Sequence, residues 1–390
     1  MFSPSAVAIV IIVLLTIALI NFVAIRTLIA LYPAGRLAII IAAVLCNVFW
    51  IAVPLIAAAR GNATARLITA VAGPPWFAWL TFALLYVAFV ALISLIWLAA
   101  GRYFTGYSEF LRPASSGFLL ITLVVAVAGF IQALVPLKVR HVPLTFPELP
   151  RGLNGTKIAL LSDLHVGMFT RQSRLRRMSE AIDRENPDIV VFDGDLVDDD
   201  PFYVPKLLRG FAGLRPSIPI YAVLGNHEMY VNPRAAIEAL RGSRIHLLVN
   251  RGALVRHGHS ELWLAGLSDF AGRGVRSDLP LAPDIRKALD GKPAGAFTIL
   301  LSHQPQAFAM ARRLRIPLTL CGHTHGGQFG WRSQRITLAG LFLPFDVGWY
   351  ERDGVQLYVT TGAGYWLVPF RFGIPPEIVM IELRGDKTGP

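Results

Sequence analysis

Charged residues and cysteines are both scarce in this chain of 390 residues. Only 16% of the residues are charged and 54% are hydrophobic, whereas an average soluble domain is roughly 25% charged. This composition excludes a disordered chain, because disordered chains combine low hydrophobicity with high charge. The two cysteines, Cys46 and Cys321, are too few for a disulfide framework or for a zinc site made of thiolates.

The shortage of charge is concentrated in the first 150 residues, which hold eight Lys or Arg and two acids. Each of four uncharged apolar runs has the ~20 residues that an α-helix needs to cross a hydrocarbon core of ~30 Å. We therefore predict a transmembrane domain of four spans over residues 1–141, followed by a linker over residues 142–155. The four runs are residues 6–25, 37–59, 76–100 and 117–137.

Basic residues in the predicted loops bear on the orientation of this domain, because cytoplasmic loops are enriched in Lys and Arg. The loops on one face hold four basic residues, and those on the face of the C-terminal domain hold five. This small excess leaves the side of the membrane open and favours a cytoplasmic C-terminal domain only slightly. We expect an integral protein of a bacterial inner membrane.

From residue 156 onward the pattern changes to short apolar runs that alternate with helical segments at residues 171–185 and 233–240. Strands alternating with helices predict an α/β domain with a largely parallel sheet and helices on the outside. Such folds bind ligands beyond the carboxyl ends of their strands. The predicted strands are residues 157–161, 188–192, 218–224, 245–249, 262–265, 298–301, 318–321, 357–360 and 378–383.

Histidines, acids and one asparagine follow five of these strands where each strand ends. Because parallel strands end at one edge of a sheet, we expect these side chains to converge. Imidazole, carboxylate and amide ligands suit Mn, Fe, Zn or Co, and a shared carboxylate can hold two cations ~3.5–4 Å apart. The sequence therefore predicts a site for divalent metal ions, with catalytic candidates His227 and Asp198 beside it. The candidate ligands are Asp163, His165, Asp195, Asn226, His303, His323 and His325.

The combined motifs resemble those of the calcineurin-like metallophosphoesterase superfamily. They read Asp163-x-His165, Gly194-Asp195-x-x-Asp198, Gly225-Asn226-His227-Glu228, His303 and Gly322-His323-x-His325. The closing stretch, with Pro369-x-Arg371, is similar to the YkuE/YaeI-like membrane-associated branch, and multi-span members resemble transmembrane proteins with a metallophosphoesterase domain. The resemblance covers residues 156–385 and implies a four-layer αββα sandwich.

The same resemblance implies a role for each residue of the motifs. Two metal ions would be bridged by Asp195, and a water molecule that they activate would be the nucleophile. His227 would act as general acid or transition-state stabiliser, oriented by Asp198. The other ligands would be Asp163, His165 and His325 for the first metal, and Asn226, His303 and His323 for the second.

The chain departs from the pattern of the superfamily's protein phosphatases after Asp198. Those enzymes continue with Arg-Gly, which helps to hold phosphate, whereas this chain continues with Asp199 and Asp200. Repulsion between like charges therefore disfavours a dianionic phosphoprotein substrate. Arg371 is the candidate for a compensating positive charge at the substrate, and its alternative is a purely structural arginine.

The sequence predicts a membrane-anchored phosphoesterase that hydrolyses a P–O bond of a phosphodiester, a pyrophosphate or a monoester. The membrane anchor makes a lipid-linked substrate one candidate, and the aromatic stretch 364–370 could touch acyl chains or belong to the core. A phosphodiesterase for cyclic nucleotides or other small soluble molecules that is merely tethered is an alternative. A non-catalytic membrane sensor or transporter is another. No nucleic-acid partner is expected, because the basic run 171–177 is typical of a solvated helix face.

Overall fold

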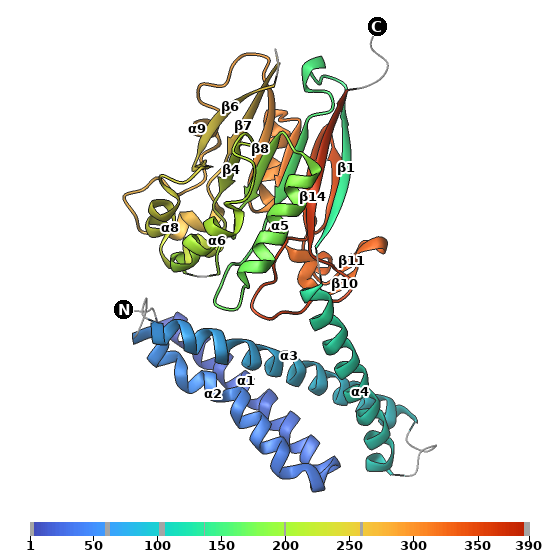
Figure 1. Cartoon of the computed structure of the whole chain (residues 1–390). Coiled ribbons are helices and arrows are strands. Elements are labelled where there is room, and N and C mark those ends of the chain that lie inside the picture. Colours follow the sequence, from blue (N-terminus) through green and yellow to red (C-terminus); the bar gives the residue numbers. More distant parts are fainter. Residues whose placement is uncertain are drawn as a thin grey trace. The chain divides into compact units, whose positions relative to one another are not determined.

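The computed structural model describes residues 4–58, 63–100, 106–135, 137–198, 200–257 and 260–385. Residue 59 at the end of the second predicted span, residue 136 in the fourth and Asp199 lie outside the described residues. The chain forms two compact units, Met1–Ala128 and Gly129–Pro390. We describe each unit by itself (Figure 1).

The first unit consists of long apolar helices. Two helical segments, Pro75–Ala100 and Tyr107–Leu134, are long and apolar enough to cross a membrane. A third candidate is the pair Leu15–Leu31 and Pro33–Asn47, whose two parts are bent by 119°. The helices are α1 (Pro4–Leu31), η1 (Pro33–Gly35), α2 (Arg36–Ala58), α3 (Ala63–Ala100) and α4 (Tyr107–Leu134), of which α4 continues into the second unit.

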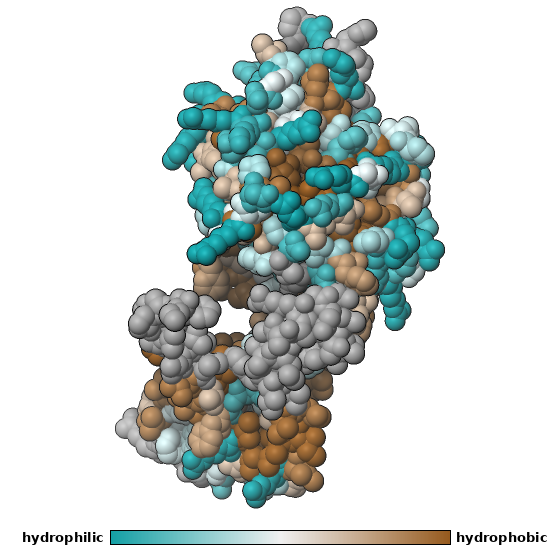
Figure 2. Space-filling model, turned by 90° about the vertical axis from the view of Figure 1, so that its left-hand side faces the viewer, coloured by the Kyte–Doolittle hydropathy of each residue, from teal (hydrophilic) through white to brown (hydrophobic). Residues whose placement is uncertain are grey.

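The described residues thus provide two spans, or three if the bent pair counts as one, and the prediction of four spans is not confirmed. The bend follows from Pro33, which begins η1 and has no N–H to continue the hydrogen bonding of α1. Most of the coloured surface of this unit is hydrophobic (Figure 2). Its polar side chains pair between helices, since Asn21 Oδ1 accepts hydrogen bonds from Trp79 Nε1 at 2.6 Å and Asn47 Nδ2 at 3.2 Å.

The second unit contains two mixed six-stranded sheets and a small two-stranded sheet, where the alternating pattern predicts one largely parallel sheet. The first large sheet has the order β1-β14-β2-β3-β4-β5, and its neighbours are parallel except for β14 and β2. Its strands are β1 (Lys138–Phe146), β2 (Lys157–Leu161), β3 (Ile189–Asp193), β4 (Ile220–Val223), β5 (Ile245–Leu247) and β14 (Glu377–Gly385).

The second large sheet has the order β12-β13-β9-β8-β7-β6, with parallel pairing from β13 through β7. Its outermost strands, β12 and β6, are antiparallel to their neighbours. The strands are β6 (Arg251–His257), β7 (Ser260–Gly266), β8 (Phe297–Leu301), β9 (Leu318–Cys321), β12 (Gly348–Arg352) and β13 (Val355–Val359); β10 (Gly330–Trp331) and β11 (Ile336–Thr337) form the small sheet.

Three apolar cores hold the layers together. The central core packs Ile158 and Val191 of the first sheet against Leu264 and Ile299 of the second. A second core lies between the outer face of the first sheet and helices α5, α6 and α8, and a third covers the second sheet with α9 and α10. The helices are α5 (Gln172–Glu185), α6 (Val204–Phe211), α7 (Asn226–Val231), α8 (Pro233–Leu240), α9 (Ile285–Ala288) and α10 (Phe308–Leu314), with 3-10 turns η3 (Arg151–Leu153), η4 (Pro201–Tyr203), η5 (Phe270–Gly274), η6 (Pro305–Ala307), η7 (His325–Gln328), η8 (Arg332–Gln334) and η9 (Ala339–Leu341).

The predicted linker, residues 142–155, is in part a strand. Residues 142–146 form the second half of β1, which pairs in parallel with β14 from Lys138↔Glu377 to Phe146↔Gly385. Leu144 and Phe146 are buried in the central core. Pro143 is tolerated because β1 is an edge strand, where one side of the backbone needs no hydrogen bond. The second unit therefore begins before residue 156.

Candidate metal centre

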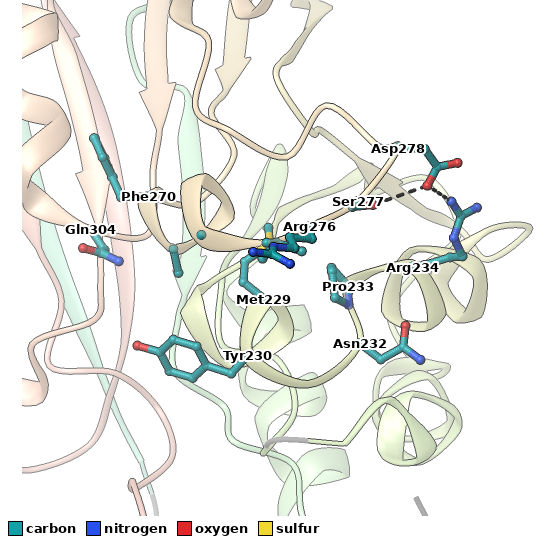
Figure 3. A pocket seen from close by; sticks show the side chains of 13 residues that line it. Met229, Tyr230, Asn232, Pro233, Arg234, Phe270, Arg276, Ser277, Asp278 and Gln304 are labelled. Atoms are coloured by element: carbon teal, nitrogen blue, oxygen red, sulfur yellow. Dashed lines mark hydrogen bonds and ion pairs between the residues drawn. The ribbon is translucent and has the colours of Figure 1, made fainter. Parts of the chain in front are cut away.

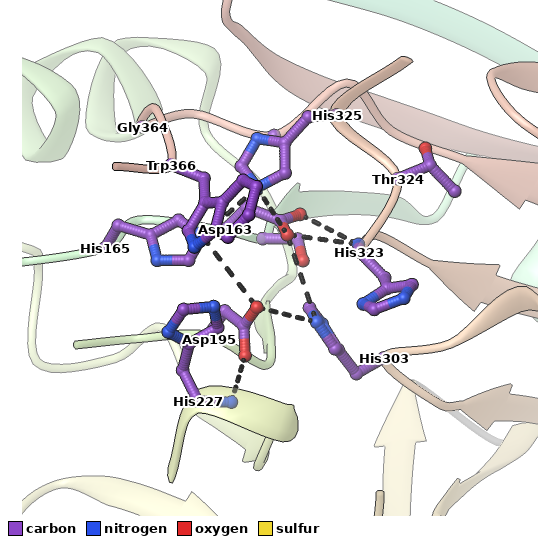
Figure 4. A network of polar contacts seen from close by, with 12 residues as sticks. Asp163, His165, Asp195, His227, His303, His323, Thr324, His325, Gly364 and Trp366 are labelled. Carbon is purple, nitrogen blue, oxygen red and sulfur yellow. Dashed lines mark hydrogen bonds and ion pairs between the residues drawn. The ribbon is translucent and has the colours of Figure 1, made fainter. Parts of the chain in front are cut away.

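The predicted site residues meet at one edge of the two sheets. They follow the carboxyl ends of β2, β3, β4, β8 and β9, which are strands of the parallel parts of both sheets. Figure 4 shows the side chains of Asp163, His165, Asp195, His303 and His325 gathered together from separate loops. Three overlapping groups have ligand atoms within 4.8 Å of one another: Asp163, His165 and His325; His165, Asp195 and His227; and Asp195, His303 and His323.

The first group brings two imidazole nitrogens together with a carboxylate. The Nε2 atoms of His165 and His325 lie 3.1 Å apart, and His325 Nε2 is 3.3 Å from Asp163 Oδ1. All three residues are buried. Asp163 also accepts hydrogen bonds from the backbone N–H of His323, 3.1 Å from each carboxylate oxygen. These two nitrogens and one oxygen therefore lie close enough together to coordinate one metal ion.

Asp195 is the centre of the other two groups, and it also reaches the first. Asp195 Oδ2 lies 3.0 Å from His303 Nε2 and 3.8 Å from His165 Nε2. The amide oxygen of Asn226 is 2.8 Å from Nδ1 of His323, so the two atoms can hydrogen-bond or share one cation. Asp195 is thus the side chain placed between the two halves of the cluster, as a bridging ligand must be.

Opposite charges set the protonation of Asp195 and His303. Burial alone would raise the pKa of Asp195, but the charge and hydrogen bond of His303, with the charges of His165 and His227, hold it well below its ordinary value. Burial would conversely lower the pKa of His303, and Asp195 raises it well above its ordinary value. The other ring nitrogen, Nδ1, donates to the backbone carbonyl of Asp193 at 2.8 Å, which aims Nε2 at the centre.

Two other imidazoles are held neutral. Burial and then the charge of His303 lower the pKa of His323 to about 4. Burial, followed by the charges of His165 and Arg371, lowers the pKa of His325 well below its ordinary value. A metal ligand must be unprotonated, so both residues are ready to coordinate at neutral pH.

His227 begins the short helix α7 together with Asn226 and faces the same cluster. Its backbone N–H donates to Asp195 Oδ1 at 3.0 Å, and its ring lies 4.6 Å from the ring of His165 between centroids. Asp198, whose side chain is 40% exposed, has Oδ1 3.9 Å from His227 Nδ1 and 3.6 Å from His165 Nδ1. Asp198 therefore stands within ion-pair range of both imidazoles, at separations longer than a hydrogen bond.

Backbone strain is concentrated in these loops. Asp163, His165, Asp195, His323 and His325 all have positive φ, between 43° and 71°. A non-glycine residue in this region costs on the order of 1–3 kcal/mol and persists only where its surroundings enforce it. Five candidate ligands share this conformation, so the fold gives up stability to direct them toward one point.

The ligand atoms suit divalent cations. Asp163 and Asp195 bring two carboxylates into one water-poor space, where like charges repel strongly. Burial is the main cause that raises the pKa of Asp163. Added divalent charge would offset this repulsion, and a mixture of imidazole, carboxylate and amide oxygen fits Mn, Fe, Zn or Co. The residues present could therefore hold metal ions.

Comparison with known proteins agrees with this geometry. Residues 156–327 match the family described as calcineurin-like phosphoesterase. An uncharacterized metallophosphoesterase of Helicobacter pylori is 34% identical over 280 residues, which cover 71% of this chain and 71% of that protein. The chain belongs to the calcineurin-like metallophosphoesterases. A zebrafish (Danio rerio) transmembrane protein with metallophosphoesterase domain is 36% identical over 273 residues, covering 68% of this chain and 62% of that protein, so the match spans less than two thirds of the zebrafish chain.

A further relative is the uncharacterized metallophosphoesterase YkuE of Bacillus subtilis. It is 29% identical over 250 residues, which cover 61% of this chain and 82% of that protein. These matches confirm the family and the likeness to transmembrane and YkuE-like members.

Arg371 of this metallophosphoesterase lies against His325, and its contact with a substrate stays a prediction. Its side chain is fully buried. The guanidinium donates to the backbone carbonyls of Gly364 at 2.8 Å and Ile374 at 3.4 Å, and lies 3.0 Å from Nδ1 of His325. Burial lowers the pKa of Arg371 to about 9. Its contacts make it a residue that positions His325.

Glu228 is a buried acid of this metallophosphoesterase site that received no role from the sequence. Its carboxylate accepts hydrogen bonds from the backbone N–H groups of Gly225 at 2.8 Å, Asp195 at 3.2 Å and Val197 at 3.1 Å. Glu228 thus joins the loop after β4 to the loop after β3. It was visible in the sequence as the last residue of the Gly-Asn-His-Glu motif.

Two further buried acids, Asp193 and Asp269, also lie beside His303 and received no role from the sequence. Burial raises the pKa of both carboxyls, and the charge of His303 acts in the opposite direction on each. Asp269 in turn contributes to the raised pKa of His303. Asp269 could have been found in the sequence, because it follows β7 as other acids of the site follow their strands.

A cavity of about 930 Å³ opens next to the metal centre. Its lining includes Tyr230, whose ring lies 5.7 Å from that of His227, and Gln304, the neighbour of His303. Figure 3 shows Tyr230, Phe270, Gln304 and Arg276 around it. The lining therefore combines aromatic rings with amide and guanidinium groups, and it lies on the side of His227.

Proposed function

We propose that this chain is a membrane-anchored hydrolase of phosphoesters that uses two divalent metal ions. The arrangement of Asp195 supports this proposal most directly, because its carboxylate lies within 4.8 Å of ligand atoms from His165 and from the pair His303 and His323. The first metal would be held by Asp163, His165 and His325, and the second by Asn226, His303 and His323. The apolar segments Pro75–Ala100 and Tyr107–Leu134 support the anchoring.

The bound ions would polarise the phosphoryl oxygens and lower the pKa of a water molecule that attacks phosphorus. Side chains of the protein would supply the proton for the leaving group. His227 faces the same space and would donate a proton to the leaving oxygen. Asp198, within ion-pair range of His227, favours the protonated imidazole that this step needs.

A phosphodiester is the class of substrate that we favour. The partly exposed carboxylate of Asp198 stands at the site and repels a second negative charge on phosphate. A diester carries one charge on its phosphate and a monoester nearly two at neutral pH. The cavity beside His227 has room for the second ester group. A pyrophosphate could be hydrolysed by the same steps, because its bridging oxygen leaves phosphorus as an ester oxygen does.

The test uses the full-length chain in detergent, reconstituted with Mn²⁺, and compares bis-p-nitrophenyl phosphate with p-nitrophenyl phosphate. Loss of a general acid typically costs ~10²–10⁴-fold in rate where the leaving group is a poorly stabilised alkoxide, so His227→Asn should lose that much activity on glycerophosphocholine while keeping its metals. The loss on the p-nitrophenyl esters should be smaller, because p-nitrophenolate leaves without being protonated. Asp195→Asn should lose metal and activity together. His246→Asn changes an exposed histidine on β5 and should match the unaltered chain.

Full activity of the His227→Asn chain would contradict the assigned acid. A chain that binds metal but hydrolyses neither ester would favour the non-catalytic sensor or transporter instead. Faster cleavage of the monoester than of the diester would overturn the substrate class while leaving the hydrolase proposal intact.

A further inference from the structure

Large apolar side chains are exposed together on one segment of the second unit, residues 329–343, which we call the apolar platform. Phe342 is 80% exposed and Leu341 72%. Soluble proteins rarely expose a contiguous patch of this kind without a partner. Its exposed apolar members are Phe329, Trp331, Ile336, Leu338, Leu341, Phe342 and Leu343.

The platform is a folded element that holds these side chains outward. Strands β10 and β11 pair within it, and the Leu338 N–H donates to the carbonyl of Phe329 at 2.8 Å. Asp346 is buried beside the segment and accepts hydrogen bonds from the hydroxyls of Tyr350 and Thr337. The apolar side chains are therefore presented to the outside by a built scaffold.

An aromatic stack joins the platform to the end of helix α4. The Phe329 ring lies 5.4 Å from that of Phe372 and 6.5 Å from that of Phe370. Phe370 packs on Gly129 so closely that a Cβ atom there would lie 2.2 Å from the phenylalanine ring. The Arg371 N–H donates to the carbonyl of Gly129 at 2.9 Å. These contacts all lie within the second unit.

The stack meets α4 inside its apolar part. Gly129 precedes Leu134, the last residue of α4, by five residues, or about 7.5 Å at ~1.5 Å per residue. In a membrane-spanning α4 this level lies near the exit from the bilayer, where Trp and Tyr side chains gather, and Trp331 of the platform is exposed. Apolar faces that lie on a membrane sink ~5–10 Å into this same zone.

The loop after β13 connects the platform with the metal centre. Its Gly364 N–H donates to the carbonyl of Asp163 at 2.8 Å, and the ring of Trp366 lies 6.3 Å from that of His227. The Trp366 N–H also donates to Gln328 Oε1 at 2.9 Å, next to the platform. Trp366 and Phe370 are four residues apart, at most ~14 Å along an extended chain. The loop after β13 therefore links the metal centre to the platform within the second unit.

We propose that the apolar platform docks into the interfacial layer of a lipid bilayer and that the metal centre acts on the phosphoester of a membrane amphiphile. The exposed apolar side chains support the docking, as does the aromatic stack that connects them to Gly129 of α4. The substrate class rests in addition on the proposed hydrolase function. A soluble ester would gain nothing from a platform that holds the site at a bilayer surface.

Depth-dependent quenching tests the docking. The full-length chain with Cys46→Ala is reconstituted into phosphatidylcholine vesicles with brominated acyl chains, and a bimane label is attached at Phe342→Cys. Cys321 is fully buried and stays unlabelled. Leu314→Cys is the matched control, because Leu314 is an exposed leucine that ends α10 just before β9 begins, at the sheet edge opposite the metal centre.

We expect bromolipid to quench the label at position 342 and to leave the label at 314 nearly unchanged. Equal quenching at both positions, or none at 342, would overturn the docking and would leave a second copy or another protein as the platform's occupant. This readout involves no hydrolysis, so it stands or falls independently of the proposed function.

Hydrolysis tests the substrate class. Leu341→Ser/Phe342→Ser in the full-length chain is compared with Leu314→Ser on a head-group-labelled phosphatidylethanolamine in vesicles and on soluble bis-p-nitrophenyl phosphate. Loss of two apolar side chains from the lipid layer should lower lipid cleavage about tenfold or more and leave soluble cleavage within about twofold.

Equal cleavage of the lipid by both variants would overturn the proposal, as would a parallel loss on both substrates. An unaltered chain that cleaves only the soluble ester would overturn the substrate class. Failure of the unaltered chain on both substrates would instead count against the hydrolase function.

Discussion

At the scale of single residues, His303 and Asp195 stabilise each other's charge, because His303 Nε2 lies 3.0 Å from Asp195 Oδ2. The raised pKa of His303 means that its ring carries two protons at neutral pH in the metal-free chain. Asp195, whose pKa is lowered, has no proton to lose. A metal ligated by His303 must displace the imidazolium proton, whereas one ligated by His323, with a pKa of about 4, need not.

We therefore predict that metal binding at pH 7 releases roughly one proton from His303. The release should vanish as the pH rises above the raised pKa of His303, because the ring is then already neutral. Calorimetric titration with Mn²⁺ in two buffers of different ionisation enthalpy measures it. Identical heats in the two buffers at pH 7 would contradict the assignment, and His303→Asn should remove the buffer dependence.

The sequence could predict which residues gather in the centre but not what surrounds them. Asp163, His165 and Asp195 were identifiable because each closely follows an apolar strand. The sequence left open whether Arg371 contacts the substrate or is structural, because a positive charge near a phosphate motif looks the same in sequence whether it is exposed or buried. Its full burial behind His325 depends on loops from distant parts of the chain.

At the scale of elements, the turn between β4 and α7 is set by the small size of Gly225. A Cβ atom there would lie 2.1 Å from Asp195 Oδ1 and 2.5 Å from the Asp195 backbone nitrogen. The glycine φ is −99°, so the requirement is space and not backbone conformation. The turn and the β3 loop can therefore approach each other only with glycine at this position.

Gly225→Ala should destabilise the chain by about 1–3 kcal/mol through overpacking and reduce its metal content. Thermal unfolding and elemental analysis of the purified chain measure the two effects. Gly213→Ala is the control, because a Cβ atom there would meet only Ser179 Oγ at 3.9 Å. An unchanged metal content in Gly225→Ala would refute the tight coupling of the two loops.

The strands that sequence patterns predicted best are buried inside the sheets. The bounds of β2 and β9 coincide with the predicted ranges, as do those of helix α8. Among the strands of the two large sheets, β1, β6 and β12 were missed, and all three lie at sheet edges. An edge strand needs fewer apolar residues, as in β12, whose five residues are all at least partly exposed. Its pairing depends on partners that no local pattern reveals.

At the scale of the whole molecule, the division into apolar helices and an α/β unit followed directly from composition. The prediction of four spans is not confirmed, because the described residues provide two, or three if the bent pair counts as one. Among the described residues, the segments Leu15–Leu31 and Pro33–Asn47 meet at a bend of 119°, which length and hydropathy do not reveal.

Metal binding should stabilise the folded α/β unit. A ligand at 100 times its Kd adds about 2.7 kcal/mol, and each kcal/mol shifts the midpoint of a unit of this size by about 2–4 °C. We expect Mn²⁺ to raise the thermal midpoint of the full-length chain by several degrees and a chelator to reverse the rise. Asp183→Asn, which alters an exposed ion pair with Arg215, should keep the effect. A midpoint indifferent to Mn²⁺ would contradict the metal centre.

The pairing of β1 with β14 has a consequence for synthesis of the chain. Strand β1 leaves the ribosome soon after α4, but its partner among the described strands, Glu377–Gly385, is made more than 200 residues later. Until β14 has been translated, β1 and the neighbouring side of β2 both lack the strand that separates them. A chain released too early would thus display two open sheet edges, which are templates for aggregation. Synthesis of β14 therefore completes the first sheet.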